Sequence, residues 1–192
     1  MPSRPLILGA HLSVAGGIER AVVSAAGLGF NALQVFTHQP RAWSSPRHSS
    51  ESIDAFKRLR RAHRIKPVIV HAPYLPNVAT PDAAVWRHSI SVVTHDLKVA
   101  DSIEAAYYVL HPGSTKGREG AFGVQRVADA LCMVFDSYLP RLTFLLENTS
   151  GAGSLVGSSF AELADLIGRV NDRCPAARLG VCMDTAHCCA AG

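Results

Sequence analysis

The chain has 192 residues, of which 48% are hydrophobic and 18% are charged. This balance excludes a disordered chain, and we expect residues 1–192 to form a single domain with a sizeable core. No apolar run approaches the roughly 18 residues that span a bilayer, and residues 1–10 lack the apolar segment of a secretion signal. We therefore expect a cytoplasmic protein with no membrane partner.

The formal net charge is +4, which permits a polyanionic partner but does not demand one. The five cysteines are odd in number and none form a C-x-x-C pair, so we expect free thiols in a reducing compartment.

Short apolar segments alternate with longer amphipathic segments along the whole chain. The apolar segments predict strands at residues 6–10, 32–36, 67–70, 107–110, 143–146 and 179–183. The amphipathic segments predict helices at residues 17–28, 50–63, 83–102, 122–138 and 159–170. The strand segments lack alternating polar residues, which is typical of a parallel sheet covered on both faces. We therefore predict an α/β fold with right-handed crossovers.

A polar residue that could bind a metal follows five of the six predicted strands. These residues are His11, His71, His111, Glu147 and Asp184, and the last four are separated by 36 to 40 residues, about one βα unit each. The carboxyl ends of parallel strands meet at one mouth, so these side chains should lie close together.

Imidazoles and carboxylates that converge without an equal number of cations are a ligand set for zinc or another divalent transition metal. His187 lies three residues after Asp184 and extends the set. A single histidine at a strand end is ordinarily a polar residue at the core edge, and a single carboxylate there ordinarily caps a helix. Four such positions in series favour the metal site.

Six motifs resemble the endonuclease IV family, and together they span essentially the whole chain. They are Gly9-Ala10-His11-Leu12-Ser13 with Ala15-Gly16-Gly17 after it; Phe36-Thr37 with Arg41 and Trp43; His71-Ala72-Pro73-Tyr74-Leu75-Pro76-Asn77; Leu110-His111-Pro112-Gly113-Ser114; Leu146-Glu147-Asn148-Thr149-Ser150-Gly151; and Gly180-Val181-Cys182-Met183-Asp184-Thr185-Ala186-His187. The resemblance implies a TIM-like (β/α)₈ barrel, of which about six βα units are present here.

The resemblance also implies an activity: zinc-dependent cleavage of DNA 5′ to abasic sites in base-excision repair, leaving a 3′-hydroxyl. Three zinc ions are expected in the complete fold, with Mn²⁺ as the alternative metal. By motif, His71, His111 and Glu147 would hold the first ion. The catalytic Glu147 would join Asp184 at the second, and His187 would serve the third. The partner would be double-stranded DNA with abasic sites, bound by a protein that is a monomer when complete.

The candidate DNA-binding residues are Arg41, Tyr74 and His11. The resemblance places Arg41 and Tyr74 in the minor groove as a wedge and a stacking residue. An exposed loop charge is the alternative interpretation of Arg41. The basic segment at residues 57–64 is typical of a solvated helix face.

Two other functions remain open from the sequence. A metal-dependent sugar isomerase or epimerase barrel also places Glu, Asp and His at its strand ends. An inactive fragment of the nuclease would keep the ligands without the cleavage activity.

The family's remaining ligands would lie beyond Gly192, so we expect this sequence to be truncated at its C-terminus. We therefore predict little or no abasic-site cleavage by residues 1–192 alone. An incision assay on abasic duplex DNA with added zinc measures this, and robust, chelator-sensitive incision would contradict it.

Overall fold

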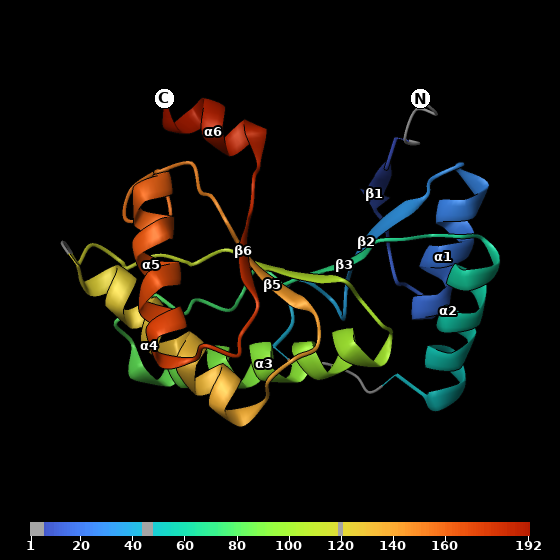
Figure 1. Cartoon of the computed structure of the whole chain (residues 1–192), viewed down its shortest axis with the longest axis horizontal. Coiled ribbons are helices and arrows are strands. Elements are labelled where there is room, and N and C mark those ends of the chain that lie inside the picture. Colours follow the sequence, from blue (N-terminus) through green and yellow to red (C-terminus); the bar gives the residue numbers. More distant parts are fainter. Residues whose placement is uncertain (1–5, 44–47, 119–120) are drawn as a thin grey trace.

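The computed structural model describes residues 6–43, 48–118 and 121–192. Strands and helices alternate throughout, and the helices lie around one sheet (Figure 1). The strands are β1 (Gly9–His11), β2 (Ala32–Phe36), β3 (Val68–His71), β4 (Tyr107–Leu110), β5 (Thr143–Glu147) and β6 (Leu179–Cys182). The helices are α1 (Ile18–Gly27), α2 (Ser50–Ala62), α3 (Ala83–Ser102), α4 (Phe122–Ser137), α5 (Phe160–Arg173) and α6 (Thr185–Ala191). None of the helices in these ranges is long and apolar enough to cross a membrane.

The sheet is parallel, and its strands follow one another in chain order from β1 to β6. The predicted α/β architecture is therefore confirmed. Paired residues in a parallel sheet point to the same face, so the register shows which side chains share a face. His71 pairs with Phe36 and Val109, and Glu147 pairs with Cys182. The polar strand ends consequently share the face opposite the one that packs against the helices.

The helix-facing side of the sheet carries the core. Tyr108 and Phe144 are paired on β4 and β5, are fully buried, and have ring centroids 5.3 Å apart. Phe135 of α4 meets Phe144 edge-on at 5.5 Å. Burying such rings removes large apolar areas from water, which is the main free-energy gain of folding. The other face is less covered, because alternate residues of β2 and β5 are only half-buried. The prediction that both faces are covered is therefore wrong for the described residues.

The first strand also differs from its prediction. Leu6, Ile7 and Leu8 were expected in a buried strand, but they are 77%, 63% and 55% exposed and precede β1. Their backbone binds the Asn31 side chain: Leu8 N–H donates to Asn31 Oδ1 at 2.7 Å, and Asn31 Nδ2 donates to Leu6 O at 2.8 Å. These residues therefore lie along the edge of the sheet, where the structure pairs β1 with β2 alone.

Several other features agree with the sequence. Helix α3 and strand β4 have the predicted limits. All five cysteines are free thiols. Ser159, the first residue of the predicted fifth helix, is the N-cap of α5, where its side chain accepts a hydrogen bond from Glu162 N–H.

A buried polar network joins the loop after β2 to helix α3. Asp96 of α3 is fully buried, accepts hydrogen bonds from Thr37 Oγ1 at 2.6 Å and Tyr108 Oη at 3.3 Å, and lies 3.4 Å from His38 Nδ1. The His38 ring also reaches Ala42 O through Nε2 at 3.2 Å. The network therefore fixes the first part of the loop that carries Arg41.

The hydrogen bond to Asp96 raises the pKa of His38 above its usual value, although burial acts in the opposite direction. A folded-state pKa above the unfolded value, about 6.5, means that the interaction stabilises the fold fully below that pH. The stabilisation is lost as pH rises through the folded-state pKa of His38.

We predict that His38→Gln lowers the free energy of unfolding by about 1.5–3 kcal/mol at pH 6 and by less at pH 9, because hydrogen bonds to charged groups contribute about that much. Urea denaturation of wild type and variant at the two pH values measures the difference. The control is Arg58→Gln, on the exposed face of α2, which removes no group that titrates between pH 6 and 9 and should show no pH-dependent difference. An equal loss for His38→Gln at both pH values would contradict the prediction.

Candidate metal centre

The carboxyl ends of β3, β4 and β5 bring three polar side chains together. His71 ends β3, His111 follows β4, and Glu147 ends β5. The Glu147 Oε2 atom lies 2.9 Å from His71 Nε2 and 3.1 Å from His111 Nε2. One ligand atom from each residue lies within 4.8 Å of those from the other two. The structure thus brings together three of the residues that the strand spacing placed at one mouth, and they are the three for which the resemblance implies a shared ion.

The hydrogen bonds of His71 orient its ring for metal binding. His71 Nδ1 lies 2.7 Å from Ala72 O, and a carbonyl oxygen can only accept, so Nδ1 carries the hydrogen. In the neutral ring the Nε2 lone pair therefore points toward Glu147 and His111. Backbone carbonyls commonly fix metal-binding histidines in this way, and the donor set fits a zinc ion.

Burial lowers the pKa of His111. The neighbouring Glu147 acts in the opposite direction, and His71 and His187 add to the lowering. A neutral imidazole is the form that binds a metal, so this environment favours the binding form of His111.

A second group forms where β6 ends. Glu147, Asp184 and His187 each offer one ligand atom, and these atoms lie within 4.8 Å of one another. Asp184 caps α6: its Oδ1 accepts a hydrogen bond from His187 N–H at 2.9 Å, and this bond is the main cause of its lowered pKa. His187, which the resemblance implies for a separate third ion, lies close enough to share an ion with Glu147 and Asp184.

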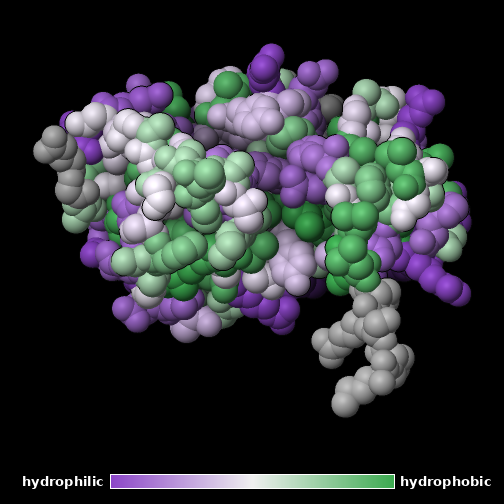
Figure 2. Space-filling view, turned by 90° about the horizontal axis from the view of Figure 1, so that it is seen from above, coloured by the Kyte–Doolittle hydropathy of each residue, from purple (hydrophilic) through white to green (hydrophobic). Residues whose placement is uncertain are grey.

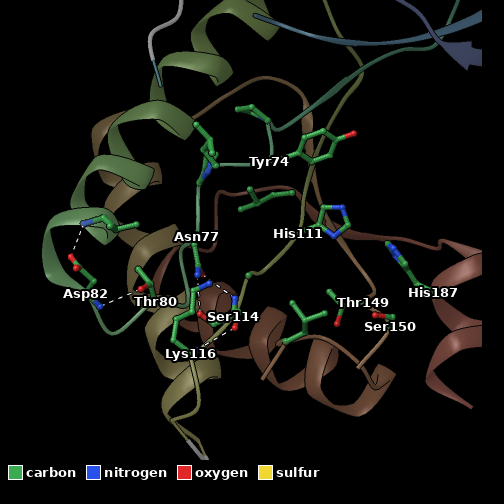
Figure 3. A pocket seen from close by; sticks show the side chains of 17 residues that line it. Tyr74, Asn77, Thr80, Asp82, His111, Ser114, Lys116, Thr149, Ser150 and His187 are labelled. Atoms are coloured by element: carbon green, nitrogen blue, oxygen red, sulfur yellow. Dashed lines mark hydrogen bonds between the residues drawn. The ribbon is translucent and has the colours of Figure 1, made fainter. Parts of the chain in front are cut away.

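One residue of each group, His111 and His187, lines a cavity of about 760 Å³. The rings of His111 and His187 point into the same space, beside Thr149 and Ser150 (Figure 3). The ring centroids are 5.4 Å apart and meet edge-on. Away from the two histidines, the cavity extends along Asn77 and Ser114 to Lys116. From above, where α6 lies, hydrophilic side chains gather in the middle of the surface between more hydrophobic areas (Figure 2).

Of the three candidate DNA-binding residues, Tyr74 lines this cavity, and none of the three belongs to either ligand group. Tyr74 is 64% exposed and meets Phe36 edge-on at 5.4 Å, and Arg41 is exposed in the loop after β2. His11 contacts Phe36 at 4.1 Å between ring centroids and lies 6.3 Å from His71. Its pKa is lowered, first by burial and then by His71. Trp43, in the motif of Arg41, packs against His88 of α3 at 4.5 Å.

The sequence analysis assigned no role to two asparagines whose side chains hydrogen-bond to the backbone of the loops around the site. Asn77 binds the backbone of Ser114, in the loop after His111, and Asn148 binds the backbone of Asp184. Asn148 directly follows Glu147 within a quoted motif. That adjacency was the available signal, but nothing in the sequence shows which backbone groups the side chain reaches.

Comparison with known proteins agrees with the fold. The chain is 41% identical over 185 residues to "Probable endonuclease 4" of Halothermothrix orenii, covering 96% of this chain and 66% of that protein. It is 35% identical over 204 residues to "Apurinic-apyrimidinic endonuclease 1" of Saccharomyces cerevisiae, covering 100% of this chain and 54% of that protein. The chain thus spans between about half and two thirds of the length of these relatives.

Solved structures give the same picture. The crystal structure of endonuclease IV from Thermus thermophilus matches with a TM-score of 0.84 at 35% identity, covering 96% of this chain and 64% of that one. A D-psicose 3-epimerase structure matches with a TM-score of 0.71 at 15% identity, covering 93% of this chain and 63% of that one, and this likeness shows the fold alone.

The resemblance to endonuclease IV read from the six motifs is therefore confirmed, and so is the barrel architecture. The model of the xylose isomerase-like TIM barrel family matches residues 22–192, and the chain belongs to that family.

Proposed function

We propose that this chain forms the metal-binding and DNA-binding part of a zinc-dependent endonuclease of base-excision repair. The reaction is hydrolysis of the phosphodiester 5′ to an abasic site, which leaves a 3′-hydroxyl. Two observations support the proposal: the 34–41% identity to proteins named endonuclease 4, and the arrangement of ligands around Glu147.

The sharing of Glu147 between two ligand groups is the observation that carries the proposal. A carboxylate has two oxygens and can contact two ions. Pairs of ions about 3.5–4 Å apart are typical of enzymes that hydrolyse phosphodiesters. A sugar epimerase that works around one divalent ion needs only one such group.

The ligand types suit zinc. His71, His111 and His187 offer imidazole nitrogens, and Glu147 and Asp184 offer carboxylate oxygens, a set that manganese also accepts. When bound, such ions polarise the phosphodiester and lower the pKa of water. The residues of the chain orient these ligands: backbone carbonyl groups hold the rings of His71 and His187, and burial lowers the pKa of His111.

The DNA contacts assigned to this function come from the rim of the mouth. Arg41 offers a cation to the phosphate backbone or the minor groove, and the exposed ring of Tyr74 offers a stacking surface beside the abasic nucleotide. His11 lies on the same side of the site as Phe36 and adds a polar group near the sheet.

Metal titration tests the ligand assignment. We predict that the metal-stripped chain binds Zn²⁺ and that Glu147→Gln weakens binding more than His71→Ala or His187→Ala, because Glu147 belongs to both groups. Loss of each histidine should weaken one group by at least about 10–100-fold. Calorimetric titration measures affinity and stoichiometry.

The control for this titration is His63→Ala, which removes an exposed imidazole outside both groups. Its affinity and stoichiometry should equal those of the wild type. Unchanged stoichiometry in Glu147→Gln would remove that residue from the proposed centre.

Incision tests the activity. We predict that this chain, in the full-length context of its relatives, cuts a duplex 5′ to a single abasic site and that chelation abolishes the cut. Glu147→Gln should lower kcat at least about 100-fold, because the ligand set stabilises transition-state charge by several kcal/mol. Arg41→Ala should mainly raise KM for abasic duplex, since it removes a binding contact.

The matched control for Arg41 is Arg58→Ala, on the basic exterior helix α2, which should leave both constants unchanged. Epimerisation of a ketohexose without incision of DNA would overturn the proposal.

A further inference from the structure

Asn148 is buried beside the second ligand group, next to Glu147 in the sequence and in contact with Asp184. It belongs to neither group of candidate ligands. It is 3% exposed and directly follows Glu147. Its backbone N–H donates to Cys182 O at 3.2 Å, which extends the contact between β5 and β6 beyond the last paired residues. Asn148 is therefore part of the junction between the two strands that carry Glu147 and Asp184.

The side chain of Asn148 holds Asp184 from both sides of its backbone. Oδ1 accepts a hydrogen bond from Asp184 N–H at 2.6 Å, and Nδ2 donates to Asp184 O at 3.1 Å. Nδ2 also points to Cys188 Sγ of α6 at 3.3 Å. Because the amide contributes one acceptor and two donors, no other side chain of similar size can make all three contacts.

The position of the Asp184 backbone in turn determines where α6 begins. Asp184 is the N-cap residue: its carboxylate accepts from His187 N–H, and its carbonyl accepts from Cys188 N–H at 3.0 Å. Displacing Asp184 would therefore move His187 with it.

The backbone carbonyl of Asn148 acts directly on the His187 ring. His187 Nδ1 lies 2.9 Å from Asn148 O, and a carbonyl can only accept. Nδ1 therefore carries the hydrogen, and in the neutral ring Nε2 keeps its lone pair for an ion. One residue thus sets the backbone of Asp184, the start of α6 and the tautomer of His187.

Asn77 makes the same kind of contact elsewhere in the site. Its Oδ1 accepts from Ser114 N–H at 3.0 Å, and its Nδ2 donates to Ser114 O at 2.9 Å (Figure 3). Ser114 lies three residues beyond His111 and carries no ligand of either group. The contact of Asn148 differs because the residue that it holds is itself a candidate ligand.

We propose that Asn148 is a positioning residue that sets the metal affinity of the group formed by Glu147, Asp184 and His187. The group formed by His71, His111 and Glu147 does not depend on it. The inference rests on the proposed metal centre, but it also predicts a property of the metal-free chain: Asn148 holds His187 in its Nδ1–H tautomer.

Metal titration in two backgrounds separates positioning from general stability. In His71→Ala, where only the second group is intact, adding Asn148→Ala should weaken Co²⁺ binding about 10–100-fold, measured by visible absorption. In His187→Ala, where only the first group is intact, adding Asn148→Ala should change affinity by less than about 3-fold, which lies within the context dependence of such contacts. Equal weakening in both backgrounds, or none in either, would overturn the proposal.

The control for fold stability is Leu166→Ala, a truncation on the buried face of α5. It should lower the free energy of unfolding by about 2–5 kcal/mol without changing Co²⁺ affinity in either background.

Nitrogen-15 NMR of the histidine rings in the metal-free chain supplies a readout that does not depend on the metal centre. Wild type should show the Nδ1–H tautomer for His187, and Asn148→Ala should shift the ring toward a mixture as α6 loses its anchor. An unchanged His187 tautomer in the variant would overturn the inference and leave the proposed function standing. A wild-type chain that shows the expected tautomer but binds no metal would overturn the proposed function and leave the positioning of His187 by Asn148 standing.

Discussion

The carboxylate of Glu147 lies at the end of a buried strand with imidazole nitrogens at 2.9 and 3.1 Å. Burying a carboxylate costs several kcal/mol unless hydrogen bonds, cations or metal ions compensate. An ion held between Glu147 and the rings of His71, at the end of β3, and His111, just after β4, would supply that compensation. The remaining features of the site follow from this constraint: the rings need fixed tautomers, the loops need fixed backbones, and both need a rigid sheet beneath them.

The parallel register places the core residues on one face of the sheet and the candidate metal ligands on the other. Residues such as Tyr108 and Phe144 face the helices and are fully buried, so changes there act on stability. The alternate residues of β3, β4 and β5 point to the other face, toward which His71 and Glu147 end their strands and His111 follows β4. Since the two sets alternate along each strand, a shift of register by one residue would exchange the ligands for core residues.

Much of this organisation could be predicted from the sequence, because it depends on local patterns. The limits of α3 and β4, the order of the elements and the ligand-bearing strand ends all follow from apolar segments and the residues after them. The expected strand at residues 6–10 was wrong in extent, because a continuous apolar run does not reveal that a segment lies at an edge. There the Asn31 side chain, just before β2, binds Leu8 N–H and Leu6 O in place of a backbone partner.

The contacts of Asn148 and Asp96 could not be predicted, because each joins residues that are far apart in the chain and depends on side-chain direction. A buried aspartate in an amphipathic helix reads as a polar residue of the exposed face. Asp96 meets its partners Thr37 and Tyr108 only because the loop after β2 and strand β4 both pack against α3. Distant polar pairs of this kind give no periodic signal.

The contact between Asn77 and Gly113 constrains how this sequence can vary. Gly113 adopts a φ of 99°, and a Cβ atom there would collide with Asn77 Oδ1. A side chain at position 113 therefore requires both a different backbone and a different residue at position 77. Among natural variants the two positions should change together or remain fixed. Co-variation of positions 77 and 113 would indicate that the loop after His111 has the same geometry in these variants, even where the ligands are invariant.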